Sequence, residues 1–69
     1  MTVKTIKHPD DLIMDRVYQV SAEGTTRRMT FCGLTLNDRM LCLRLRTVNR
    51  KYLIPWKFIT NIEECERDD

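Results

Sequence analysis

The sequence has no long apolar segment. Its longest run of uncharged apolar residues covers only positions 40–43, whereas a helix that crosses a membrane needs about 20 such residues. Residues 1–7 also lack the apolar stretch that a secretory signal peptide carries. We therefore expect a soluble, cytoplasmic protein that has no membrane partner.

Glycine and proline are scarce, with two of each among 69 residues. This scarcity excludes collagen-like and low-complexity chains, and a hydrophobic content of 42% argues against a wholly disordered one. A chain of this length forms one small domain, which buries only roughly 60% of its unfolded surface and therefore has a thin core. We expect this domain to span residues 1–69, with its core at 10–62 and an acidic tail at 63–69.

Residues that carry out catalysis or bind metals are also few. His8 is the only histidine, and it precedes a proline near the N-terminus. Cys32, Cys42 and Cys65 form an odd set without C-x-x-C spacing, so we expect reduced thiols that pack as small apolar groups. The segment 17–62 contains only two carboxylates, and no nucleophile, base and orienting group stand in a recognisable arrangement. The sequence therefore predicts that the protein is not an enzyme and has no metal site and no cofactor.

The order of short patterns along the chain predicts a mainly β protein. From residue 16 onward, β-branched and aromatic residues alternate with polar ones, and turn residues separate the runs. Pro9 suits a first helical position, and the aspartates after it suit the positive end of a helix. Gly33 is expected to mark a bend or bulge, and Pro55 to end a strand or lie at an exposed edge. The expected elements are a short helical turn at 8–15, strands at 17–22, 26–32, 39–48, 51–54 and 59–62, and a 3₁₀ turn at 55–58.

Five short strands in so short a chain favour a small, strongly bent β-barrel. Closure into a barrel removes the sheet edges, which so small a sheet cannot cover in another way. Leu41, Leu43 and Leu45 are predicted to share the core face of the third strand, because side chains alternate between the two faces of a strand. The other residues expected in the core are Leu12, Ile13, Tyr18, Phe31 and Phe58.

The segment 52–62 resembles the end of an SH3 domain. In that family a hydrophobic-Pro-x-x-aromatic-hydrophobic segment forms a 3₁₀ turn and enters the last strand. The residues at matching places are Ile54, Pro55, Phe58, Ile59 and Ile62. The resemblance implies an SH3-like barrel. It also implies that Pro55 and Phe58 correspond to residues that help eukaryotic SH3 domains to bind proline-rich peptides.

The longer segment 10–62 resembles an Sm-like domain, as in the bacterial Sm-type RNA chaperone. Gly24 stands where that family has its first-turn glycine, and residues 38–41 stand where it has an acid and an aromatic residue at the start of a strand. Trp56 and Lys57 stand where the family has a basic pair that contacts RNA. The resemblance implies an Sm-like barrel that binds RNA and assembles with copies of itself.

Positive charge is concentrated in the middle of the chain. Residues 27–57 contain eight basic residues against one acid, a net charge of +7, although the whole chain carries only +2. If Cys32 lies opposite Cys42, then Arg28 faces Arg46 across the second and third strands. Like charges that face each other are destabilising unless an anion lies between them. This register therefore predicts a phosphate or carboxylate site on the outer face of the sheet.

The charge pattern and the resemblance together predict one binding surface for nucleic acid or for an acidic partner. Arginines bind phosphate or carboxylate groups, and a tryptophan beside a lysine can stack a base while the lysine contacts a phosphate. In the alternative interpretation the arginines extend into water or pair with the acidic tail, and Trp56 closes one end of the core. The candidate binding residues are Arg28, Arg44, Arg46, Arg50, Lys51, Trp56 and Lys57.

Three functional hypotheses are compatible with this sequence. The first is a non-catalytic regulatory module that binds RNA or single-stranded DNA through its basic face. The second is an adaptor or inhibitor, encoded by a phage or mobile element, that docks on an acidic surface of a larger protein. The third is a subunit that folds fully only in a homo-oligomer, since so small a core gains stability from an added interface.

Overall fold

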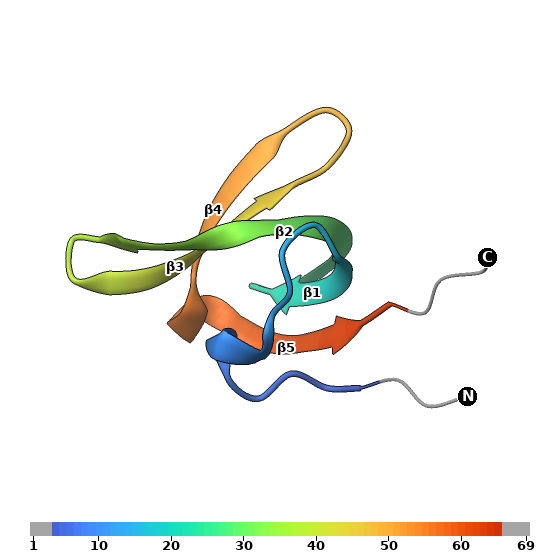
Figure 1. The fold of residues 1–69 in the computed structure, drawn as a ribbon, viewed down its shortest axis with the longest axis horizontal. Coiled ribbons are helices and arrows are strands. Elements are labelled where there is room, and N and C mark those ends of the chain that lie inside the picture. Colours follow the sequence, from blue (N-terminus) through green and yellow to red (C-terminus); the bar gives the residue numbers. More distant parts are fainter. Residues whose placement is uncertain (1–3, 66–69) are drawn as a thin grey trace.

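The computed structural model describes residues 4–65, which form a single antiparallel β-sheet and two 3₁₀ turns (Figure 1). The prediction of a mainly β protein with five strands is confirmed. In chain order the elements are η1 (Pro9–Asp11), β1 (Val17–Ala22), β2 (Thr25–Asn37), β3 (Met40–Arg46), β4 (Lys51–Pro55), η2 (Trp56–Phe58) and β5 (Ile59–Glu64).

The sheet is open, with the strand order β4-β3-β2-β1-β5. β4 and β5 lie at opposite edges and do not pair, so the predicted closure into a strongly bent barrel is wrong. One physical reason is that the outer edge of β5 is already occupied. Ile6 donates its N–H to the carbonyl of Ile62 and Glu64 donates to the carbonyl of Lys4, each at 2.8 Å. The start of the described chain therefore covers the edge that would have to meet β4.

Two tight turns connect the first three strands. Glu23 and Gly24 have φ values of 52° and 80°, and Asp38 and Arg39 have φ values of 53° and 66°. Two consecutive positive φ values are typical of the type I′ turn, whose twist matches that of a β-hairpin. The second turn lies one residue later than the sequence predicts. The hairpin of β2 and β3 is long and extends well beyond the other strands (Figure 1).

Gly33 forms the predicted bulge. The pairing of β2 with β3 shifts between Phe31 and Gly33, where one extra residue enters β2. Gly33 has a φ of 129°, which L-residues rarely adopt. The extra residue reverses the alternation of side chains along the rest of β2. Leu34 and Leu36 therefore share the face of Phe31, whereas uninterrupted alternation would place them on the opposite face.

Replacement of Gly33 by alanine is expected to lower the free energy of unfolding by about 1–3 kcal/mol, because a side chain is strained at this φ. The added Cβ would meet only the end of the Met14 side chain, whose Cε would lie at an ordinary 3.5 Å, so the cost comes from the backbone rather than from a clash. Urea unfolding measures the loss. Gly24→Ala is the control, because its φ of 80° is closer to the left-handed helical region and nothing lies within 4 Å of its Cβ position. A Gly33→Ala loss no larger than that of Gly24→Ala would contradict this account.

The hydrophobic core covers one face of the sheet. Leu43 and Leu45 are fully buried on the core face of β3, as the alternation predicts. Ile13 and Phe58, which the sequence places in the core, are 47% and 46% exposed, so these two predictions are wrong. The core cluster consists of Ile6, Leu12, Tyr18, Val20, Met29, Phe31, Leu43, Leu45 and Ile62, with Tyr52, Ile54, Trp56 and Ile59 packed against it.

The N-terminal helix expected at 8–15 is only the three-residue turn η1. Leu12 has extended backbone angles, and Asp15 has a φ of 68°, so the helix ends at once. The backbone N–H groups that would form hydrogen bonds within a longer helix form tertiary hydrogen bonds instead. Ile13 donates to the hydroxyl oxygen of Tyr18 at 2.8 Å, and Asp15 donates to the carbonyl of Phe31 at 2.8 Å.

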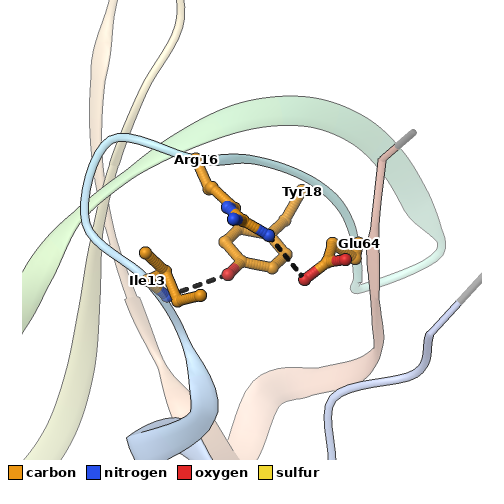
Figure 2. Close-up of polar contacts among 4 residues, drawn as sticks. All are labelled: Ile13, Arg16, Tyr18 and Glu64. Carbon is orange, nitrogen blue, oxygen red and sulfur yellow. Dashed lines mark hydrogen bonds and ion pairs between the residues drawn. The ribbon is translucent and has the colours of Figure 1, made fainter. Parts of the chain in front are cut away.

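Tyr18 holds this segment against the sheet (Figure 2). Its ring is fully buried and meets the Phe31 ring edge-on, with centroids 6.4 Å apart. Its hydroxyl accepts the N–H of Ile13, while Arg16 Nη1 lies 3.2 Å from Glu64 Oε2 on β5 (Figure 2). One buried ring therefore connects the N-terminal segment, β1 and β2, and the neighbouring ion pair adds a link to β5.

Candidate functional site

The face of the sheet opposite the core carries exposed cations. On β3, Arg44 and Arg46 alternate with the buried Leu43 and Leu45, so both arginines point away from the core. Their side chains are exposed, as the sequence predicts. The pairing of β3 with β4 places Lys51 beside Arg46 and Leu53 beside Arg44.

A hollow of ≈ 730 Å³ lies beside these cations. Arg44, Arg46 and Lys51 line it together with Thr35 of β2 and Leu53 of β4. The cations thus come from two neighbouring strands, and a hydroxyl group comes from a third. The hollow is open to solvent and combines positive charge and hydrogen-bond donors with apolar side chains such as Leu36 and Leu53. The cations suit an anionic group.

A second hollow extends the cationic surface toward β1. It has a volume of ≈ 340 Å³ and is lined by Arg28, Arg46 and the apolar Val17 and Val48. Arg46 lines both hollows and therefore connects them. We call this surface the basic face, and it consists of Arg28, Arg44, Arg46 and Lys51.

The structure corrects the register behind the predicted anion site. Cys42 lies opposite Thr35 rather than opposite Cys32, and Arg46 lies opposite Thr30 rather than opposite Arg28. The hairpin turn sets Asn37 opposite Met40, and a hairpin's register follows from its turn. The direct opposition of two arginines is therefore wrong, although Arg28 and Arg46 still line a common hollow.

Few negative charges neutralise the basic face. Among residues 4–65, its only ion pair joins Arg46 Nη2 to Asp15 Oδ1 at 3.9 Å, and both side chains are largely exposed. Such exposed pairs contribute little to stability. The alternative interpretation of the sequence has these arginines pair with the acidic tail at 63–69. Glu64 of this tail pairs with Arg16, which is not part of the basic face, and residues 66–69 lie outside the described part of the chain.

The remaining predicted site residues do not line the two hollows. Trp56 is half-buried and packs against the core cluster. This is the packing that the alternative interpretation of the sequence describes. Lys57 Nζ lies 5.5 Å from the centroid of the Phe58 ring, on η2. Arg50 lies in the exposed turn between β3 and β4, where its N–H donates to Thr47 Oγ1 at 3.2 Å.

The sequence did not indicate two features, one at the basic face and one on the core side of the sheet. Thr35 lines the larger hollow because the bulge at Gly33 reverses the alternation of β2, and the glycine was the available signal for this reversal. Arg27 on β2 lies 5.9 Å from the centroid of the Tyr52 ring on β4. No pattern in the sequence indicates this cation–π contact, because it joins strands that are not neighbours in the sheet.

Within 4–65, histidine, cysteine and carboxylate side chains do not gather in a group of three that could hold a metal ion. Neither of the 3₁₀ turns described there approaches the length of a membrane-crossing helix. Comparison with protein-family models, with curated proteins and with solved structures gives no match for this chain.

Proposed function

We propose that the protein is a non-catalytic module that binds RNA or single-stranded DNA through its basic face. The observation that carries the proposal is the grouping of Arg44, Arg46 and Lys51 around one hollow of ≈ 730 Å³, with Arg28 in the adjoining hollow. These four cations face solvent with a single weak counter-charge among residues 4–65. A surface of this kind attracts the phosphates of a nucleic acid and releases their counterions on binding.

The chemistry of the contact follows from the side chains. The planar guanidinium groups of Arg44 and Arg46 donate paired hydrogen bonds to phosphate oxygens, and Lys51 acts as a point charge beside them. Two residues on one strand lie roughly 6.6 Å apart, so the two arginines reach different phosphates or different oxygens. A flexible single strand can bend into the hollow, whereas a DNA duplex stays stiff over about 150 base pairs.

We propose that the protein recognises the sugar–phosphate backbone of the nucleic acid rather than its bases. Proteins that bind single strands often stack bases on exposed aromatic rings. Here Trp56 packs against the core, and Tyr52, the aromatic residue that lines the larger hollow, is half-buried against the core cluster as well. Phosphate contacts carry no sequence information directly. The proposal therefore includes weak dependence on base sequence.

The proposal includes a structural relationship between this chain and Sm-like or SH3-like domains. The described residues support it in two respects. They form a small, all-antiparallel, five-stranded sheet, and the 3₁₀ turn η2 leads directly into β5, as the SH3 resemblance implies. The proposed function rests on the basic face, because a fold alone does not determine a function.

A second candidate function is docking on an acidic surface of a larger protein. One observation favours it, namely that Leu53 is 48% exposed and lines the same hollow as Arg44 and Lys51. Protein partners bury apolar side chains together with charged ones, whereas phosphates need only the charges. A polymer of glutamate serves as a probe for this candidate.

Binding of a fluorescent single-stranded oligonucleotide is expected to weaken steeply as salt rises. If all four cations of the basic face contact phosphates, the logarithm of the association constant should fall against the logarithm of salt concentration with a slope of about −3. Fluorescence anisotropy between about 50 and 200 mM salt measures this slope. Absent binding, or a slope near zero, would overturn the proposal. Tighter binding of polyglutamate than of the oligonucleotide would favour the second candidate.

A further inference from the structure

β4 has one unpaired edge, which faces away from β3 in the strand order of the sheet. The edge at the other end of the sheet is different, because Lys4 and Ile6 hydrogen-bond to Glu64 and Ile62 and cover the C-terminal half of β5. Among the described residues, β4 therefore presents the strand edge on which another strand can pair along its full length.

The hydrogen bonds of the β3–β4 hairpin show which groups this edge presents. Thr47 donates its N–H to the carbonyl of Arg50 at 2.8 Å. Hydrogen-bonded and non-hydrogen-bonded pairs alternate along an antiparallel ladder. By this alternation Tyr52 and Ile54 bond to β3, while the backbone groups of Lys51, Leu53 and Pro55 point outward.

The position of Pro55 agrees with this assignment. Proline has no N–H, so it fits where the group would point away from the neighbouring strand. The outward groups are thus the N–H and carbonyl groups of Lys51 and Leu53, since the Pro55 carbonyl, at the N-cap of η2, accepts the first hydrogen bond of that turn. Two donors and two acceptors are enough for up to four hydrogen bonds with one added strand.

On the core side, the edge borders a hollow of ≈ 330 Å³. Tyr52 and Ile54 of β4 line one side, and Val20 and Met29 of β1 and β2 line the other. Apolar residues make up five of the eight that line this hollow, and Glu23, Thr25 and Arg27 are the other three. A side chain that points inward from a strand added to β4 would contact these residues, so the hollow favours apolar side chains at alternate positions of the added strand.

On the opposite side, the edge is positively charged. Lys51 belongs to the edge strand itself, and Arg44 and Arg46 stand on β3 directly behind it. Side chains of an added strand that point to this side would lie beside Lys51 and the exposed Leu53 of β4, with the two arginines one strand further on. Acidic residues are favoured there, since opposite charges on neighbouring strands stabilise a sheet.

We propose that the free edge of β4 binds an extended segment of a partner protein, in which acidic side chains alternate with apolar ones. The backbone supplies hydrogen bonds, the hollow between β4 and β1–β2 takes the apolar side chains, and Lys51 and Arg44 meet the acidic ones. This is strand addition, in which main-chain bonds give affinity and alternate side chains give specificity.

Charge argues against a second copy of this chain as the occupant. Pairing of β4 with the β4 of another copy would bring Lys51, Arg44 and Arg46 of both copies onto one face. The β5 edge of another copy is covered by its own Lys4 and Ile6. Strand addition at β4 shares Arg44 and Lys51 with the basic face, but it does not require nucleic-acid binding, because it also depends on the backbone edge and on the hollow at the core side.

A phage-displayed library of random dodecapeptides, panned against the whole protein, tests the inference. We expect the enriched peptides to alternate acidic and apolar residues, and we expect their binding to shift the amide resonances of Lys51 and Leu53. Panning against an Arg44→Glu, Lys51→Glu variant should enrich basic residues in place of acidic ones. No enrichment, or enriched sequences without this alternation, would overturn the inference.

N-methylation of one enriched peptide distinguishes strand addition from other contacts without changing the protein. Methylation at residues whose N–H faces β4 removes a hydrogen bond and blocks close approach, so it should weaken binding by about tenfold. Methylation at the intervening residues is the matched control and should leave affinity nearly unchanged. Equal effects at both kinds of position would exclude strand addition. The oligonucleotide measurement is independent of the peptide measurement. Either result can therefore overturn its own proposal, nucleic-acid binding or strand addition, without overturning the other.

Discussion

Charge reversal of Arg44 and Arg46 together is expected to abolish binding of the single-stranded oligonucleotide. Hydrogen bonds to charged groups contribute about 1.5–3 kcal/mol each, so loss of the two guanidinium contacts should weaken binding roughly a thousandfold. The two new glutamates add repulsion from the phosphates. Fluorescence anisotropy of an Arg44→Glu, Arg46→Glu variant measures the loss. Both side chains are exposed, and their only described ion pair is weak, so the variant should fold.

A Lys4→Glu, Lys7→Glu variant is the matched control for this experiment. It changes the net charge by the same amount, but both lysines are exposed and neither lines the hollows of the basic face. Its affinity should fall only modestly through the lower net charge. If the two variants lose the same affinity, binding depends on net charge alone, and the assignment to the basic face is wrong.

Replacement of Tyr18 by alanine is expected to unfold the protein. Removal of a buried aromatic ring typically costs about 3–5 kcal/mol, and a domain of this size rarely has more than about 3–5 kcal/mol of stability. Tyr18 is completely buried, packs edge-on against Phe31 and also fixes the N–H of Ile13. Far-ultraviolet circular dichroism at room temperature should therefore show loss of the β signal.

Two variants separate the contributions of Tyr18. Tyr18→Phe keeps the ring and leaves the Ile13 N–H without its partner, so it should lower the free energy of unfolding by about 1–2 kcal/mol and remain folded. Tyr52→Ala removes an aromatic ring that is only half-buried, so its cost should lie well below that of Tyr18→Ala. A folded Tyr18→Ala variant with nearly unchanged stability would contradict the central role of this ring.

The strands were predictable because side-chain alternation is a local signal. Leu41, Leu43 and Leu45 alternate with polar or small residues, and this period of two identifies β3 and its core face without reference to the rest of the fold. The turn at Gly24 and the bulge at Gly33 were also visible, since glycine is the residue that favours positive φ. Each of these features depends on a few neighbouring residues.

Features that depend on distant contacts were not predictable in this way. The barrel prediction failed because the edge of β5 is covered by Lys4 and Ile6, which lie nearly sixty residues away in the sequence. The helix expected at 8–15 failed for a similar reason, since Tyr18 and Phe31 take its N–H groups. Phe58 was assigned to the core on residue type alone, and it lies largely at the surface.

The candidate site was predictable as a list of charges but not as a surface. Composition indicated the cationic segment, and alternation on β3 placed Arg44 and Arg46 on one face. The position of Thr35 in the lining of the larger hollow could not be predicted without the register of β2 against β3. This register depends on the position of the turn and on the bulge. The burial of Trp56 required the whole core, because a turn residue beside a lysine looks the same in sequence whether it faces solvent or not.

The pairing of β5 with β1 also has a consequence for the order in which the protein folds. The β1–β2, β2–β3 and β3–β4 pairings join consecutive strands through short turns, whereas Val20 pairs with Ile62 across almost the entire β-sheet region of the chain. Closing a long loop costs more entropy than closing a short one, and nonlocal contacts slow folding. The four-strand meander can therefore assemble while β5 and the segment that covers it remain undocked. In a partly folded molecule both ends of the sheet expose a free edge. Docking of β5 and of the segment at Lys4 and Ile6 leaves the edge of β4 as the one that is free along its full length among the described residues.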